Sequence, residues 1–205
     1  MSNVFYIERT SGGSNQISLK SKLLERRIIY LDSQINTESV TEAIQQIALL
    51  AAESSKPITM LISSGGGSII DGLALIDVMR ACPCVIKTVS VGIAASMGCV
   101  ILAAGTKGYR YITPNSQAML HQPLIAGNLP GGNCSEIETI ANSLIERKNQ
   151  INNLLVELTG KSRKHINKLT ATDTYLNAEE AVENGIVDEV ATGLTLYELI
   201  GGIAL

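Results

Sequence analysis

The segment Gly92–Gly98 (GIAASMG) contains Ser96, the serine whose surroundings best suit covalent chemistry. A strand is predicted to end at Val91 and an apolar helix to begin at the serine, which would place its hydroxyl beside unpaired amides at the positive end of the helix dipole. The small residues around Ser96 would let a substrate backbone approach closely. A serine at such a junction more often only caps the helix, so this segment alone leaves both roles open. It lacks the GxSxG sequence of the α/β-hydrolases.

The chain has two histidines, and their surroundings differ. His121 follows a predicted strand over 118–120, and the next two residues end that strand, so its side chain would stand on a rigid sheet as a general base requires. A structural, hydrogen-bonding histidine is the alternative. His165 lies in the basic segment KSRKHINK, which predicts a solvated helical turn without a role in chemistry. Among the acids, Asp173 precedes a predicted helix cap, where an Asx turn would explain it equally well.

Three glycines, Gly65–Gly67, follow a predicted strand and precede a predicted helix. Backbone amides in such a turn can surround an anion. The run lacks the Lys-Ser/Thr ending of a P-loop and the GxGxxG spacing of a dinucleotide fold. An oxyanion hole is the other use of such amides, and it fits a nearby serine nucleophile.

The elements that would position these residues alternate between strand and helix. Strands are predicted within 25–35 and over 58–62, 85–91, 109–112 and 118–120. Helices are predicted from a capping box at Ser39 and Glu42, from the end of the glycine run, and over 96–104. This order predicts an α/β fold with parallel strands and crossover helices.

The last third of the chain is predicted to be largely helical. Ser135 and Glu138 form an apparent capping box that would open a helix of about 24 residues, ended by Gly160. Packing within the same chain and docking onto a partner subunit both remain open for its apolar stripe, which comprises Ile137, Ile140, Ala141, Leu144, Ile151, Leu155 and Leu158. Another helix is predicted to start at Asn177.

Composition limits the class of protein. Of the 205 residues, 45% are hydrophobic and 17% are charged, which fits one globular domain. A net charge of −3 argues against nucleic-acid binding, which would usually show a basic face. The start lacks a signal-peptide pattern, and the uncharged stretch between Lys87 and Lys107 predicts a buried strand and helix rather than a membrane span. Four cysteines without an export signal predict reduced thiols in a cytoplasmic protein, and their spacing does not suit a zinc site.

Several segments together resemble the ClpP family, the proteolytic subunits of Clp protease. They are SKLLERRIIYL, the glycine turn, GIAASMG, AAGTKGYRYITPNS, MLHQPL, ELTGKS and TDTYLNAEEAVENGIVDEV, and they follow the family's order from Ile7 to Val190. The resemblance implies the ClpP/crotonase-like fold of repeated β-β-α units with a long projecting handle helix. It also implies a single peptidase domain over 1–205, with 1–20 as an N-terminal axial segment, 122–160 as the handle and 191–205 as a C-terminal tail.

The same resemblance implies roles for individual residues. Ser96 matches the nucleophile, His121 the base, and Asp173 the acid that orients the histidine. The amides of Gly67 and Met97 match the oxyanion hole. The implied activity is that of an ATP-dependent serine endopeptidase without a metal or cofactor.

The implied substrate is an unfolded polypeptide bound as an added strand. The residues that would contact it are Gly66, Gly67, Gln122, Pro123 and Leu124. The implied partners are further copies of the chain in two stacked heptameric rings, with or without a paralogous subunit, and an AAA+ Clp ATPase. Neither nucleic acid nor a membrane is an expected partner.

The sequence departs from the family pattern in three places. Gly65 replaces the proline of the usual Asn-Ser-Pro-Gly-Gly turn, and the loop over 125–134 is longer than usual. Thr59 and Leu61 stand where tyrosines commonly line the ATPase-docking pocket, whereas Tyr111 keeps an aromatic residue there. These differences leave open a regulatory subunit that is inactive alone. A crotonase-type acyl-CoA enzyme of shared fold is a third alternative.

Overall fold

The computed structural model describes residues 5–10, 13–124, 133–193 and 196–199 of the chain, and these residues include a seven-stranded sheet. The strand order is β3-β4-β5-β6-β9, with β7 paired to β5 and β8 to β7. All pairs are parallel except β7 with β8. The strands are β3 (Ile28–Leu31), β4 (Ile58–Ser64), β5 (Ile86–Ala95), β6 (Arg110–Ile112), β7 (Gln117–Leu120), β8 (Thr174–Leu176) and β9 (Glu189–Val190). The predicted α/β fold with parallel strands is confirmed.

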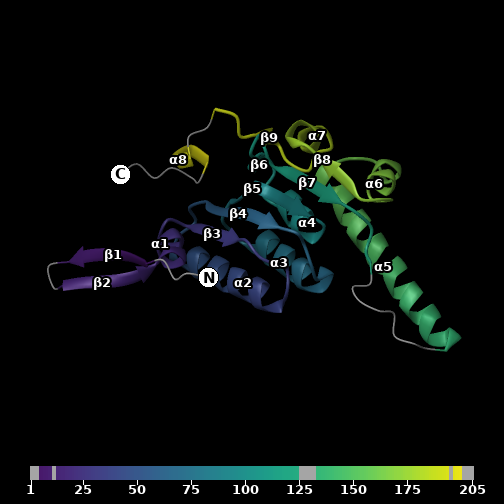
Figure 1. The fold of residues 1–205 in the computed structure, drawn as a ribbon, viewed down its shortest axis with the longest axis horizontal. Helices are drawn as coiled ribbons and strands as arrows, with labels where there is room; N and C mark the ends of the chain where they lie inside the picture. The colour runs from purple at the N-terminus through teal and green to yellow at the C-terminus, as the bar shows by residue number, and fades with distance from the viewer. Residues whose placement is uncertain (1–4, 11–12, 125–132, 194–195, 200–205) are drawn as a thin grey trace.

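Helices cover the sheet and close its hydrophobic core. Those described are α1 (Leu19–Glu25), α2 (Thr37–Glu53), α3 (Ile69–Ala81), α4 (Met97–Ala103), α5 (Cys134–Thr159), α6 (Arg163–Leu169), α7 (Ala178–Glu183) and α8 (Leu196–Leu199). Figure 1 shows α2 and α3 together on one side of β3 and β4, with α8 on the other side. The main core lies between these helices and the sheet, where side chains such as Met60, Ile62 and Leu75 are fully buried.

Two elements project from opposite ends of this body (Figure 1). At one end, β1 (Phe5–Thr10) and β2 (Gly13–Ser18) form an antiparallel hairpin separate from the main sheet. At the other end, α5 extends outward for much of its 26 residues and ends at Gly160, whose backbone is left-handed, as predicted. Only Ile151, Asn152 and Leu155 of α5 are buried, so the outer part of its apolar stripe remains exposed in the single chain.

Two predicted helix starts are wrong by a few residues for the same reason. The caps are Asn36 for α2 and Asn133 for α5, and each side chain accepts a hydrogen bond from the amide three residues later. Ser39 takes the third helical position of α2, and its hydroxyl accepts a hydrogen bond from the Asn36 amide. In both helices an asparagine a few residues upstream is the N-cap, in place of the serine of the Ser-x-x-Glu pattern. The start predicted at Asn177 is confirmed, again with a reciprocal pair to Glu180.

The strand that leads to Ser96 is longer than predicted. It was expected to end at Val91, but β5 continues to Ala95 because a second neighbour replaces the first. Residues 88–90 pair with β6 and residues 93–95 pair with β7, with Gly92 at a positive φ of 87° between the two registers. The helix then begins at Met97 rather than at the serine. The uncharged stretch is thus strand and helix, and no helix among the described residues is long and apolar enough to span a membrane.

A buried ion pair ties the ends of two helices to the sheet. Arg110, with 4% of its side chain exposed, contacts the Asp188 carboxylate at 2.6 Å. One of its terminal nitrogens also donates to the carbonyls of Ala103 and Leu158, at the C-terminal ends of α4 and α5. Burial alone would raise the pKa of Asp188, but the hydrogen bonds and charge of Arg110 outweigh it and hold that pKa below its ordinary value.

We expect Asp188→Asn to lower the free energy of unfolding by about 3 kcal/mol at neutral pH, because it leaves a buried guanidinium without its counter-ion. The folded-state pKa of Asp188 is depressed, so the stabilisation is complete above the ordinary aspartate pKa of about 3.9 and disappears as pH falls through the folded value. Urea unfolding should therefore show a gap between wild type and variant that closes below about pH 4. Asp77→Asn, at an exposed position on α3, is the matched control and should show no gap. An equal gap at pH 3 and pH 7 would contradict this assignment.

Candidate active site

Ser96 is the single residue between β5 and α4, and its backbone has φ 53° and ψ −123°. Residues with a side chain rarely adopt this conformation, which costs about 1–3 kcal/mol and persists only where neighbours enforce it. Here the Ser96 amide donates to the Met119 carbonyl at 2.8 Å, and its carbonyl accepts from the amides of Cys99 and Val100 at 3.0 and 3.2 Å. The sheet and the helix thus fix the turn from both sides.

The strained turn keeps the Ser96 hydroxyl from capping α4. Its side chain forms no capping hydrogen bond, whereas a capping serine would accept one from the second or third helical amide. The interpretation of Ser96 as an ordinary helix cap is therefore wrong. The hydroxyl instead lines a pocket that His121 also lines.

Strand register brings His121 opposite Asp173. β7 ends at Leu120, which pairs with Thr174 at the start of antiparallel β8. Continuing this register by one residue places His121 directly across from Asp173, and side chains at such positions have Cβ atoms about 4.5–5.5 Å apart. Leu120 is buried and points into the core. Because side chains alternate along a strand, His121 and Asp173 would both point to the opposite face of the β7–β8 pair. β8 has only three residues and no distinctive local pattern, so this strand pairing was not predicted.

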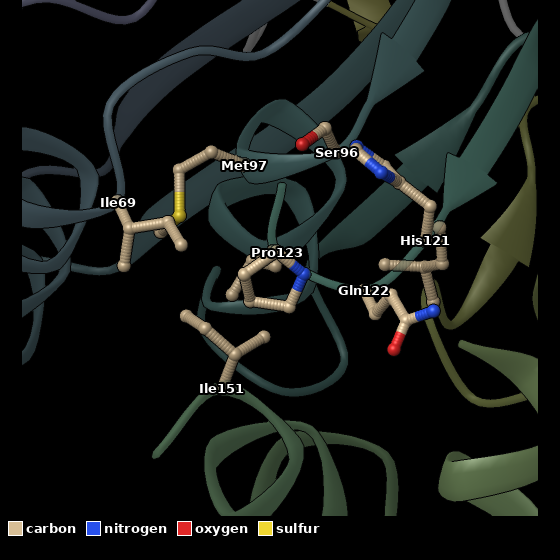
Figure 2. Close-up of a pocket in the computed structure, with 9 residues that line it drawn as sticks. Ile69, Ser96, Met97, His121, Gln122, Pro123 and Ile151 are labelled. Carbon is tan, nitrogen blue, oxygen red and sulfur yellow. The ribbon is translucent and has the colours of Figure 1, made fainter. Parts of the chain in front are cut away.

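Ser96 and His121 line the same pocket, but no hydrogen bond between described residues joins the three candidate side chains. Figure 2 shows the His121 ring directed toward the Ser96 side chain. Within the described part of the chain, no hydrogen bond joins the side chains of Ser96, His121 and Asp173, and Asp173 is exposed. Such contacts are often long in enzymes without substrate and tighten when substrate binds.

Gly66 lets the glycine turn pass directly beside the serine. A Cβ atom added at Gly66 would lie 2.6 Å from the Ser96 Cβ and 2.7 Å from the Ala95 carbonyl, and its φ of +93° also favours glycine. The amide of Gly66 donates to the Ser64 hydroxyl, so it is not available to a substrate. By contrast, a Cβ at Gly65 would meet nothing within 4 Å.

Two other amides near the serine have no acceptor among the described residues, namely those of Gly67 and Met97. Gly67 forms a bridge with Ile35, but the hydrogen bonds of that bridge come from Gly66 and Ser68 on either side. Met97 is the first residue of α4 and therefore has no carbonyl one turn earlier to bond. Both amides are the ones that the sequence resemblance assigned to an oxyanion hole.

The pocket beside Ser96 is mostly apolar. It is lined by Ile69, Ser96, Met97, Val100, Leu120, His121, Gln122, Pro123 and Ile151 (Figure 2). Gln122 and Pro123 were predicted to contact substrate, and both line this pocket. Leu124 was predicted with them, but it is 62% exposed and lies outside the lining. Sequence reasoning missed Ile69, Val100 and Ile151, because they come from three different helices and have no distinctive local pattern.

Gln122 also connects parts of the chain that surround the site. Its side-chain nitrogen donates to the Ala171 carbonyl at 3.2 Å, just before Asp173, and its oxygen accepts from the Lys148 ammonium on α5 at 3.3 Å. The residue after His121 therefore links the long helix to the segment that leads into β8.

Cys99 is the other nucleophilic side chain in this region, and it is inert. It lies in the first turn of α4 and is fully buried, and burial raises the pKa of its thiol to about 12. A protonated, inaccessible thiol is not a nucleophile. The pocket lining therefore contains the Ser96 hydroxyl beside the imidazole of His121, and Cys99 is not part of that lining.

Comparison with known families gives a match over nearly the whole chain. The family model for Clp protease matches residues 11–193. This range runs from the β1–β2 hairpin to the residues just after β9 and contains every site residue described above. The sheet and helices are those of the ClpP/crotonase-like fold that the sequence resemblance implied.

The glycine turn provides a sharp test of the geometry around Ser96. Gly66→Ala should lower the free energy of unfolding by about 2–4 kcal/mol, because the new methyl group must displace Ser96 and force a left-handed alanine. Gly65→Ala is the matched control and should change stability by less than about 1 kcal/mol, since its added atom meets open space. Urea unfolding of the two variants measures both. Equal effects at the two neighbouring positions would show that Gly66 does not pack against the serine.

Proposed function

Since the chain belongs to the Clp protease family and is a peptidase of that kind, we propose that it is a serine endopeptidase subunit with Ser96 as nucleophile, His121 as base and Asp173 as orienting acid. The strained Ser96 turn carries this proposal. It holds the hydroxyl away from the helix amides and in a pocket shared with His121. A serine kept in a costly conformation without a capping role is best explained by chemistry.

The reaction is acyl transfer in two steps. His121 takes the proton of the Ser96 hydroxyl as its oxygen attacks the peptide carbonyl, and it then gives that proton to the leaving amine. Water, deprotonated by the same imidazole, releases the acyl group and restores the serine. Asp173, across the β7–β8 register from His121, would accept the hydrogen bond that fixes the tautomer of the imidazole.

The amides of Gly67 and Met97 would stabilise the oxyanion of the tetrahedral intermediate. Their lack of other acceptors supports this role, because preorganised donors need no rearrangement when charge develops on the oxygen. Loss of one such donor typically costs about 100- to 1000-fold in turnover. A substrate strand lying along Gly66 and Gly67 on one side and along Gln122 to Leu124 on the other would bring its carbonyl between these amides and Ser96.

Assembly and delivery of substrate complete the proposal. The exposed apolar residues on the outer half of α5, such as Ile137 and Ile145, support the handle role, in which two rings contact one another through this helix. An AAA+ ATPase would unfold substrates and dock on the sheet face that carries Thr59, Leu61 and Tyr111. The β1–β2 hairpin would line the axial entrance.

One observation favours a second candidate, a subunit that is active only beside a paralogous ring. Ser96 and His121 line one pocket, but the side chains of Ser96, His121 and Asp173 form no hydrogen bonds with one another among the described residues. Neighbouring subunits could supply the constraint that aligns them.

The decisive experiment is the intact mass of the purified protein after exposure to a fluorophosphonate, which transfers its phosphonyl group to an activated serine and releases fluoride. We expect one adduct per chain, and none in Ser96→Ala. An adduct that forms only after a paralogous subunit is added would favour the second candidate. Absence of an adduct in both preparations would refute the triad.

The pocket predicts the cleavage preference. Peptides with leucine or methionine before the scissile bond should be cleaved with kcat/KM at least about tenfold higher than those with aspartate, because the lining is apolar. Ile69→Trp should lower kcat/KM for the leucine peptide more than for an alanine peptide by filling the pocket. Ile70→Trp, at the adjacent position that is 63% exposed and outside the pocket lining, is the matched control. Equal cleavage of leucine and aspartate peptides would exclude this pocket as the specificity site.

A further inference from the structure

The sheet has a second apolar face, on the side away from α2 and α3. Side chains alternate along strands, so the residues between those of the main core point outward here. Leu61 of β4, Val89 and Val91 of β5, and Tyr111 of β6 form this outer face. Val89 is fully buried, and the other three are partly buried.

The C-terminal segment of the same chain covers this outer face. Leu199, in α8, is 8% exposed and packs with Val89 and with Ala191, the latter just after β9. Figure 1 shows α8 standing over the sheet at a distance from the other helices. An apolar side chain of the tail therefore shields this face from solvent.

A polar contact fixes the tail at the edge of the outer face. The Lys87 ammonium donates to the backbone carbonyl of Glu198 at 2.8 Å and lies 4.9 Å from the centre of the Tyr111 ring. Burial lowers the pKa of Lys87, in keeping with a position beneath the tail. The outer face thus recognises two features of a peptide, a large aliphatic side chain and the backbone carbonyl just before it.

The contacts that hold α8 on the outer face are few enough for α8 to detach. α8 has four residues, which is too short for a helix to be stable by itself in water. Its described contacts with the outer face centre on Leu199 and the Glu198 carbonyl. A peptide with the same two features could compete for the outer face, because the tail gains its advantage mainly from being tethered nearby.

We propose that the segment Leu196–Leu199 is an intramolecular occupant of the outer face, and that a partner peptide with an aliphatic anchor must displace it to bind there. This inference rests on the proposed function for the partner's identity, since the outer face includes the surface suggested for ATPase docking. The tail would then lower the apparent affinity of the partner, because both bind the outer face through an aliphatic side chain.

A fluorescent peptide with the sequence of residues 195–202 (TLYELIGG) tests the proposal on full-length chains. Leu199→Asp places a charge where the anchor lies and should expel the tail, so the peptide should bind this variant at least tenfold more tightly than wild type by fluorescence anisotropy. Leu199→Ala should give an intermediate affinity. The matched control is Leu49→Asp, which introduces the same charge at an exposed position on α2, across the sheet, and should behave as wild type.

Equal peptide affinity for wild type and Leu199→Asp, or no binding to Leu199→Asp at millimolar peptide, would overturn the proposal. A peptide with aspartate in place of its anchor leucine should bind none of the chains. Fluorophosphonate labelling of Ser96 in the same preparations reports that these chains are folded at the active site. Because labelling does not depend on the tail, failure of the proposed peptidase activity and failure of this inference give different results.

Discussion

The backbone of Ser96 has a conformation that few residues with a side chain adopt, and the geometry of the site depends on what holds it there. The Met119 carbonyl fixes its amide, the first turn of α4 fixes its carbonyl, and Gly66 leaves room for its Cβ. The hydrogen bond to Met119 also continues the pairing of β5 with β7. The pairing of β7 with β8 ends at Leu120 and Thr174, the residues next to His121 and Asp173. The pairing of β5 with β7 and of β7 with β8 therefore positions the Ser96 turn and the strand ends next to His121 and Asp173.

Sequence reasoning recovered the parts of this arrangement that local patterns encode. The order of strands and helices from β3 to β7, the buried stripe of α2 and the glycine that ends α5 follow from periodicity and end signals, whereas β1, β2, β8 and β9 were not predicted. The helix starts at Asn36 and Asn133 were missed, because two overlapping capping patterns compete within a few residues. The extension of β5 to Ala95 was missed because it requires β7 as a second partner, and no local pattern reports which strands will meet.

The candidate site was predicted to a similar extent. Ser96, Met97 and His121 line one pocket, whereas their roles and that of the Gly67 amide remain predictions from the family resemblance, which also, rather than spacing, singled out Asp173. Its position depends on β8, a short strand of three residues that carries little signal. The apolar pocket was not predicted, since Ile69, Val100 and Ile151 meet only after three helices have packed. The longer loop expected over 125–134 lies, for residues 125–132, outside the described residues.

Neighbouring positions in the glycine turn differ sharply in the space available for a side chain. An added carbon at Gly66 or Gly67 would collide with Ser96 or with the Ile35 carbonyl, whereas one at Gly65 would reach open space. Any side chain at Gly66 or Gly67 therefore requires the serine or Ile35 to move, whereas a side chain at position 65 requires no such movement. Gly65, where the family resemblance implies a proline, is the position in this turn with room for a side chain. The backbone stiffness of the turn can thus change during evolution, through residue 65, without moving Ser96.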